Sequence, residues 1–272
     1  MSKLLVVGGG TMGRICAQAA VAELGADRVV VLERTAAHAA LIQTDLGVTC
    51  VTALTPDLGD FTMVVLAVKP QDAVAAITPL RPVFTQALVI SVMAGVSTAR
   101  LSELTGSARI ARCMPNTPAK IGRGMTAWTA TPHVTAADRE FITNWLNQFG
   151  ETLWVESDDW IDRVTAVSAS GPGYVFAFAA DLVSSAKTLG FTDEQANLLV
   201  QQTLLGAAEL WKSSSVTPVE LRDQVTSKGG TTAAALTVLA DAQMSVIWQK
   251  AVQAAYDRAK ALQNLNAEQN HD

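Results

Sequence analysis

The chain has 272 residues, of which 49% are hydrophobic and 17% charged, and its formal net charge is −5. This length suits one large domain or two modest ones, with ample apolar side chains for a packed core. No block of Lys and Arg stands out, which argues against a nucleic-acid partner because phosphate binding needs clustered basic residues.

Three scattered cysteines (Cys16, Cys50 and Cys113) without a C-x-x-C pair are typical of free thiols in a reducing cytoplasm. No His lies near a Cys or an acid at ligand spacing, so we expect no metal site. The N-terminus lacks the pattern of a signal peptide. The most apolar stretch, Val164–Ala180, is short for a membrane span and is interrupted by Ser and Gly, which favours a buried helix. We therefore expect a cytoplasmic protein with no membrane partner.

The first half alternates between segments typical of strands and segments typical of helices. Runs apolar on both faces, such as Thr62–Val68, indicate central strands of a parallel sheet covered by helices. Strands are predicted at Lys3–Val7, Arg28–Leu32, Val48–Val51, Thr62–Val68, Ala87–Val92, Ala108–Met114 and Gly124–Trp128, with helices at Met12–Leu24 and Ala36–Leu46. This order predicts an α/β fold, with a Rossmann-like doubly wound dinucleotide-binding domain over residues 1–157.

The second half predicts helices only. They are expected at Asp159–Ser168, Pro172–Leu189, Asp193–Ser213, Pro218–Val225, Thr231–Leu239 and Ala242–Gln263. Thr192 with Gln195 forms a capping-box pattern, and Pro218 after Thr217 marks a helix start. The alanine-rich, apolar faces of these helices predict an all-α domain over residues 158–272 that joins copies of the chain into a dimer or larger homo-oligomer.

Gly8, Gly10 and Gly13 form a G-x-G-x-x-G fingerprint between the first strand and the first helix. The first glycine permits a tight turn, the second lets the backbone approach a pyrophosphate, and the third lets helix and strand pack closely. Thr11 and Met12 lie at the helix start, where free amides and the helix dipole favour phosphate. We expect these five residues to bind a dinucleotide.

The end of the second strand leaves NAD and NADP both open as cofactor. Glu33 lies about 20 residues beyond the last fingerprint glycine, where an acid accepts hydrogen bonds from the ribose hydroxyls of NAD. Arg34 and Thr35 follow at once, and they are placed to hold the 2′-phosphate of NADP instead. Lys69, at the carboxyl end of the strand Thr62–Val68, is either a cofactor ligand or a solvated lysine.

Several longer segments together resemble the pyrroline-5-carboxylate reductase family over nearly the whole chain. The matching segments are Ala67-Val68-Lys69-Pro70-Gln71, Ser91-Val92-Met93-Ala94-Gly95-Val96, Arg112-Cys113-Met114-Pro115-Asn116-Thr117-Pro118, Ser168-Ala169-Ser170-Gly171-Pro172-Gly173-Tyr174 and Ser227-Lys228-Gly229-Gly230-Thr231-Thr232. Their order and spacing match the family and are more specific than the glycine fingerprint.

The resemblance implies that reduced NADP or NAD converts 1-pyrroline-5-carboxylate, a small cyclic imino acid, to L-proline. It implies cofactor contacts from Ala67, Val68, Lys69 and Pro70, and places Asn116 beside the nicotinamide. It also implies that the segment Ser227–Thr232 binds the substrate carboxylate. The substrate-binding residues are then Ser227, Gly229, Gly230, Thr231 and Thr232, with the Thr232 hydroxyl near the imine nitrogen as the catalytic contact. Lys228 and Gly173 depart from the family, which usually has proline and alanine there. Lys228, beside the expected carboxylate site, either adds positive charge or points to solvent, and it leaves the exact substrate open.

The chemistry of an imine fits these residues without reference to the family. A ketone reductase needs a poised acid for the developing alkoxide, and this chain has no well-placed histidine. An imine nitrogen can arrive already protonated, so that orientation and electrostatics suffice. The alternatives are a β-hydroxyacid-dehydrogenase-like oxidoreductase, which would need a catalytic lysine that Tyr174–Ala180 lacks, and a non-catalytic dinucleotide-sensing protein, which would not need the Ser227–Thr232 segment.

Overall fold

A computed structural model describes residues 3–268, and its chain forms two compact units. The first comprises the chain up to Ser170 together with the segment from Ala255 onward, and the second comprises Gly171–Ala254. These units differ from the predicted domains, residues 1–157 and 158–272. The predicted boundary was placed where the sequence changes from alternating strands and helices to helices only. That boundary remains a prediction about which residues serve the cofactor and which serve assembly.

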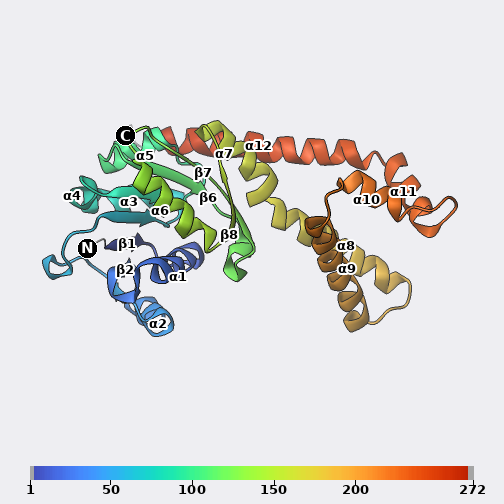
Figure 1. The fold of residues 1–272 in the computed structure, drawn as a ribbon, viewed down its shortest axis with the longest axis horizontal. Helices are drawn as coiled ribbons and strands as arrows, with labels where there is room; N and C mark the ends of the chain where they lie inside the picture. The colour runs from blue at the N-terminus through green and yellow to red at the C-terminus, as the bar shows by residue number, and fades with distance from the viewer. Residues whose placement is uncertain (1–2, 269–272) are drawn as a thin grey trace. The chain divides into compact units, whose positions relative to one another are not determined.

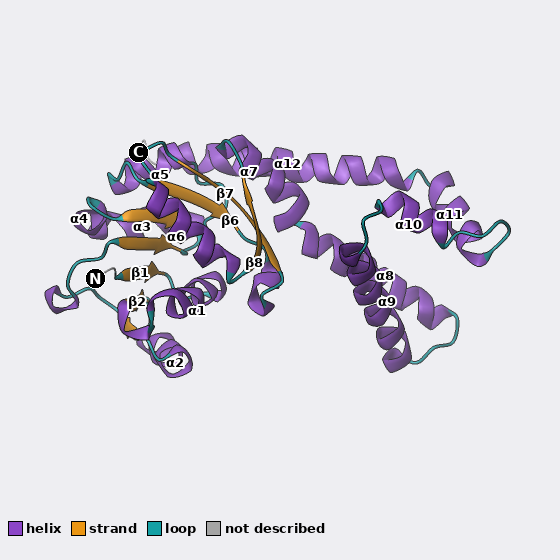
Figure 2. Cartoon of the chain, in the orientation of Figure 1, coloured by secondary structure: helices purple, strands orange, loops and turns teal. Residues whose placement is uncertain are grey.

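The first unit is built on an eight-stranded sheet, coloured orange in Figure 2. Its strands are β1 (Leu4–Val7), β2 (Val29–Leu32), β3 (Thr49–Val51), β4 (Met63–Leu66), β5 (Leu88–Ser91), β6 (Ile110–Met114), β7 (Gly124–Ala130) and β8 (Gly150–Trp154). The spatial order is β3-β2-β1-β4-β5-β6-β7-β8, so the strand order reverses between β1 and β4. In a doubly wound sheet, ligands bind outside the carboxyl ends of the strands at that reversal.

Helices cover both faces of this sheet (Figure 1). They are α1 (Thr11–Leu24), α2 (Ala36–Leu46), α3 (Ala73–Ile77), α4 (Arg81–Phe84), α5 (Thr98–Thr105), α6 (Ala136–Asn147) and α7 (Asp158–Val164), which continues into a π-helical turn at Thr165–Ala169. Alternate residues of β1 divide between the two layers. Leu4 and Val6 pack with α1, α2 and α6, whereas Leu5 and Val7 pack with α3, α4 and α5. The near-continuous apolar runs of the central strands follow from this two-sided burial.

The expected Rossmann-like domain is confirmed, with one reversed strand and five elements that the sequence did not predict: α3, α4, α5, α6 and β8. Strands β1 to β6 are parallel, but β7 runs antiparallel to β6 and parallel to β8. The central strands are thus parallel as predicted, and the sequence did not indicate the reversed direction of β7. Sequence reasoning also missed α6, which a capping box of Thr135 and Asp138 begins, and the edge strand β8.

The second unit is helical throughout. It contains α8 (Gly171–Thr188), α9 (Asp193–Ser213), α10 (Pro218–Gln224), α11 (Thr231–Asp241) and the first part of α12 (Met244–Glu268). The predicted capping box at Thr192 and the helix start at Thr217-Pro218 are both confirmed. Gln243, between α11 and α12, is the one described non-glycine residue with left-handed backbone, at φ 54°.

Few side chains of the second unit are buried within the chain itself. Its helices α8, α10 and α11 have no buried residue among those described, and α9 buries only Ala196 and Val200. The prediction of a buried helix over Val164–Ala180 is therefore wrong for the isolated chain, since Phe176 is 67% exposed. The continuous helix Asp158–Thr188 is long and apolar enough to span a membrane by length and composition, but one such helix is weak evidence for a membrane protein.

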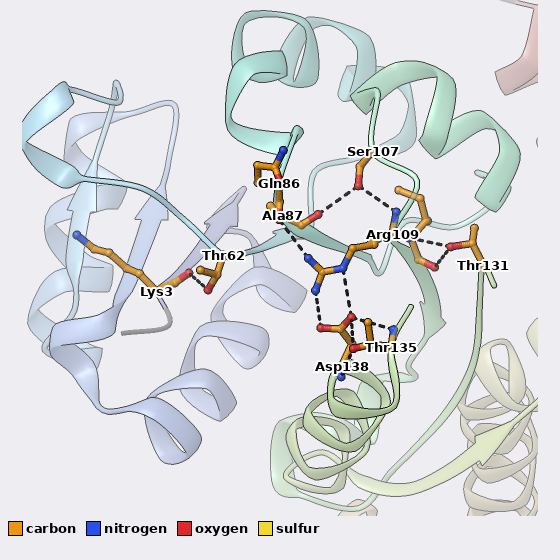
Figure 3. A network of polar contacts seen from close by, with 10 residues as sticks. Lys3, Thr62, Gln86, Ala87, Ser107, Arg109, Thr131, Thr135 and Asp138 are labelled. Atoms are coloured by element: carbon orange, nitrogen blue, oxygen red, sulfur yellow. Dashed lines mark hydrogen bonds and ion pairs between the residues drawn. The ribbon is translucent and has the colours of Figure 1, made fainter. Parts of the chain in front are cut away.

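A polar network near the starts of β5 and β6 stabilises the edge of the sheet opposite the ligand-binding edge (Figure 3). Arg109 donates from Nε and Nη2 to Asp138 on α6, at 3.2 and 2.6 Å, and from Nη1 to the Gln86 carbonyl at 3.1 Å. Burial acts to raise the pKa of Asp138, but hydrogen bonds from Arg109 and Thr135, with the charge of Arg109, leave that pKa below its usual value. The network therefore ties α6 to β6 in a way that depends on an ionised carboxylate.

Candidate active site

The turn after β1 has the geometry that a dinucleotide fingerprint requires. Gly8 has φ +98°, and a Cβ there would lie 2.9 Å from Val68 Cγ1 and 3.0 Å from the Ala67 carbonyl. At Gly13, a Cβ would lie 1.8 Å from the Gly8 carbonyl oxygen. The turn after β1, the end of β4 and the start of α1 therefore pack too closely for any side chain at either glycine. The sequence predicted both of these roles.

Gly10 differs from the other two glycines because it faces open space. A Cβ there would meet nothing within 4 Å. Gly10 is also the N-cap of α1, and no side chain caps the helix. The first amides of α1, at Thr11, Met12 and Gly13, have no partner within the helix, so they suit an anion. An uncapped helix start beside a glycine with room in front of it fits a pyrophosphate.

Glu33 lies at the end of β2 and closes one side of this turn. Its Oε2 accepts a hydrogen bond from the Gly9 amide at 3.0 Å, and its Oε1 accepts from the Thr35 amide at 3.3 Å. His38 Nδ1 lies 3.4 Å from Glu33 Oε2. The carboxylate is thus fixed beside the glycine turn, where ribose hydroxyls would be read.

Arg34, Thr35 and Lys69 are exposed in this structure. Arg34 and Thr35 stand next to Glu33, and Thr35 is the N-cap of α2 without a side-chain cap. Lys69 follows β4 in an extended conformation, at the same edge of the sheet as Gly8, and Pro70 follows it. All of the predicted cofactor residues on β1, β2 and β4 therefore gather at the carboxyl ends of adjacent strands. Their individual contacts with a cofactor remain predictions.

The side chain of Asn116, in the loop after β6, is held by two neighbouring segments. Its Oδ1 accepts from the Met125 amide at 2.9 Å, and its Nδ2 donates to the Ser168 carbonyl at 3.1 Å. The prediction that Asn116 lies beside the nicotinamide is untested. The structure adds a link between Asn116 and the π-helical turn that the sequence did not predict.

Arg112 on β6 forms a buried charge cluster that sequence reasoning missed. Its side chain is 1% exposed, and it donates to Asp158 Oδ1 and Asp162 Oδ1, both at 2.8 Å. Asp158 also accepts from the Thr98 amide and hydroxyl at the start of α5. Burial raises the pKa of Asp162 against the opposing effect of Arg112. The sequence held one indication of this cluster: an arginine within an apolar strand, and two acids four residues apart on a later helix.

Residues Ser227–Gly230 form a turn that leads into α11. Gly229 has φ +73°, and the Gly230 amide donates to the Ser227 carbonyl at 3.0 Å. Gly230 is the N-cap of α11 and no side chain caps the helix. A Cβ at Gly230 would lie 2.4 Å from Ser227 Oγ, so the serine hydroxyl sits directly over the helix start. Hydroxyls and free amides are thus gathered where a carboxylate can bind.

Among the described residues, two other kinds of chemistry are to be considered: a reactive thiol and a metal site. Burial raises the pKa of Cys16 and of Cys113, and both thiols are fully buried, which leaves them unreactive. Among the described residues, no group of three or more His, Cys, Asp or Glu is arranged to hold a metal ion.

A glycine turn at the reversal point of a doubly wound sheet, followed by a helical unit, defines a dinucleotide-dependent oxidoreductase. Comparisons agree: residues 3–95 match the model "NADP oxidoreductase coenzyme F420-dependent", and residues 158–262 match "Pyrroline-5-carboxylate reductase dimerisation". A pyrroline-5-carboxylate reductase of Vibrio alginolyticus is 36% identical over 97% of this chain and 98% of its own. The chain belongs to the pyrroline-5-carboxylate reductase family.

Solved structures support the same assignment over the whole fold. A pyrroline-5-carboxylate reductase from Coxiella burnetii has a TM-score of 0.88 at 34% identity, and covers 96% of this chain and 98% of its own. The Plasmodium falciparum pyrroline carboxylate reductase, solved with NADP bound, has a TM-score of 0.84 at 26% identity with the same coverage.

Proposed function

We propose that this protein reduces 1-pyrroline-5-carboxylate to L-proline with NADPH or NADH, the final step of proline biosynthesis. Membership of the family over nearly its full length carries this proposal. The uncapped glycine turn at the sheet reversal supports it independently of the comparisons, because it suits a dinucleotide pyrophosphate.

The residues of the first unit hold the cofactor. The amides of Thr11, Met12 and Gly13 bind the pyrophosphate, and Glu33 with Arg34 reads the adenosine ribose. When bound, the reduced nicotinamide supplies the hydride. The relative solved with NADP favours NADPH as one accepted form, whereas the fixed carboxylate of Glu33 favours NADH.

The residues of the α11 turn hold the substrate. Ser227 and the amides at Gly229 and Thr231 bind the carboxylate, which has the same charge before and after hydride transfer. Gly230, whose amide donates to the Ser227 carbonyl, shapes the turn at the substrate. Thr232 hydrogen-bonds the ring nitrogen, whose geometry changes during the step. No strong protein acid is required, because the imine nitrogen can enter already protonated.

The protein acts as a homo-oligomer that forms through its C-terminal helices, in the cytoplasm. The match to the dimerisation model and the exposed apolar side chains of α8 to α11 support this assembly. Light scattering at micromolar concentration tests it, and a stable, active monomer would exclude it.

The activity is tested with a panel of cyclic imino acids and both cofactors, with loss of nicotinamide absorbance and proline formation as readouts. We expect 1-pyrroline-5-carboxylate to be reduced most efficiently. The variant Thr232→Ala, purified identically, controls for a contaminating host enzyme because its turnover should be lower. Oxidation of a hydroxy acid without reduction of any pyrroline carboxylate would contradict the proposal.

A further inference from the structure

One side-chain amide joins three segments of the first unit at the ligand-binding edge of the sheet. Asn116 follows the carboxyl end of β6. Its Oδ1 accepts from the backbone of Met125 at the start of β7, and its Nδ2 donates to the backbone of Ser168 in the π-helical turn. Ser168 Oγ lies 3.4 Å from the same Nδ2. Both polar atoms of the Asn116 side chain are therefore used within the protein.

The Ser168 carbonyl lacks its α-helical partner because of a proline four residues later in the sequence. In an α-helix, the carbonyl of residue 168 would accept from the amide of residue 172. Residue 172 is Pro, which has no amide hydrogen. The helix has already widened at this point, since the Ser170 amide donates to the Thr165 carbonyl five residues back, at 2.9 Å. Asn116 therefore supplies from outside the helix a hydrogen bond that the sequence removes from within it.

The opposite end of the same helical segment is fixed to the same strand. Arg112, four residues before Asn116, is fully buried and forms ion pairs with Asp158 and Asp162, each at 2.8 Å. β6 thus holds α7 at its first turns through charge, and the π-helical turn at its end through the Asn116 amide. A π-helical turn within an α-helix is frequently found at a functional site.

We propose that Asn116 is a positioning residue for hydride transfer. It sets the loop that follows β6 against the end of the helical segment 158–170. This inference rests on the proposed function. Strands β4 and β5 lie between β6 and β1 in the sheet. We therefore expect the glycine turn after β1, which binds the pyrophosphate in the proposed function, to keep its structure without Asn116. Loss of the Asn116 contacts should therefore disturb the placement of the reacting groups and leave the affinity for the cofactor nearly unchanged.

The first test is the variant Asn116→Asp, which keeps an acceptor for the Met125 amide but cannot donate to the Ser168 carbonyl. We expect kcat to fall roughly tenfold to a hundredfold, the scale of a small misplacement of reacting groups, while the NADPH Kd changes less than about threefold. Asn147→Asp is the matched control. Asn147 is exposed and only accepts a hydrogen bond, from Thr152 Oγ1 at 3.4 Å, so its kcat should match that of the wild type.

The second test restores the missing donor. Pro172→Ala returns an amide hydrogen at residue 172, so Asn116→Asp should cost less kcat in the Pro172→Ala background than in the wild type. Melting temperatures show whether the Asn116→Asp variant folds. If it does not, Asn116→Ala, which introduces no charge, is compared in the same two backgrounds.

Three results would overturn the inference: unchanged kcat in both Asn116 variants, an NADPH Kd that rises as much as kcat falls, or additive effects of the two substitutions. If the wild type is active and any of these results is found, the positioning role of Asn116 is refuted and the proposed function stands. If the wild type reduces no pyrroline carboxylate, the proposed function is refuted, and the positioning role of Asn116 is refuted with it.

Discussion

Two alanine substitutions in the glycine turn should separate cofactor binding from folding. At Gly13, a new Cβ would lie 1.8 Å from the Gly8 carbonyl oxygen, so helix and turn must move apart by at least about 1.2 Å to reach a 3.0 Å contact. Overpacking of this kind costs roughly 1–3 kcal/mol, against a gain of about 1 kcal/mol from placing alanine in a helix. Gly13→Ala should therefore lower the melting temperature or, at best, leave it unchanged.

Gly10→Ala should behave in the opposite way. Gly10 has φ −65° and ψ −172°, which alanine adopts without strain, and no atom lies within 4 Å of its Cβ position. Stability should change by less than about 1 kcal/mol. The methyl group would enter the space in front of the α1 amides, where loss of one charge-assisted hydrogen bond is worth about 1.5–3 kcal/mol. The NADPH Kd should therefore rise roughly tenfold to more than a hundredfold.

The assay combines thermal unfolding without cofactor with titration of NADPH fluorescence. Wild-type affinity in a well-folded Gly10→Ala variant would refute the reasoning, because the space in front of the helix would then not hold the pyrophosphate. The Gly13→Ala variant serves as the comparison, since it should lose stability before it loses affinity.

Further predictions concern the ribose site, the substrate turn and the acid stability. Arg34→Ala should weaken the binding of NADPH more than that of NADH, and Glu33→Ala should do the reverse, each by about tenfold or more. The Kd values for both cofactors test this, and equal effects on both would show that neither residue contacts the ribose end of the cofactor. Thr232→Ala should lower kcat by roughly tenfold to a few hundredfold, whereas Ser227→Ala should mainly raise KM; an unchanged kcat in folded, saturated Thr232→Ala would remove the nitrogen contact. The lowered pKa of Asp138 makes its contribution to stability complete above the ordinary value of 3.8 and lost as pH falls through the folded-state pKa. Urea unfolding across acid pH should therefore show a shallower loss in Asp138→Asn than in the wild type.

The elements proposed to bind the cofactor could be predicted because their sequence signals are local. The turn at Gly8, Gly10 and Gly13 needs only the strand before it and the helix after it, and the structure has both. The helix starts at Thr192 and Thr217 were predictable for the same reason, since a capping box lies within four residues.

The reversal of β7 and the edge strand β8 could not be read from periodicity. An apolar run such as that of β7 fits a buried strand in either direction, and direction is set by the connection and by pairing with β6. β8 alternates weakly because it lies at the edge of the sheet, where Leu153 and Trp154 are more than 40% exposed.

The contacts of Arg112 and Asn116 escaped prediction for a different reason. Asp158, Asp162 and Ser168 lie about 50 residues away in sequence, and nothing in the local pattern pairs an arginine of β6 with Asp158 and Asp162. Family resemblance indicated Asn116 as part of the site, but it did not predict that the side-chain amide of Asn116 hydrogen-bonds the backbone of two other segments.

The scarcity of buried side chains in α8 to α11 makes the stability of the second unit a matter of mass action. A helix with no fully buried side chain in one chain gains little hydrophobic free energy until another copy covers its apolar face. Folding and association then become one equilibrium, and its midpoint moves with protein concentration. Dilution alone should unfold these helices, and a free energy of unfolding quoted for them has meaning only beside the concentration at which it was measured.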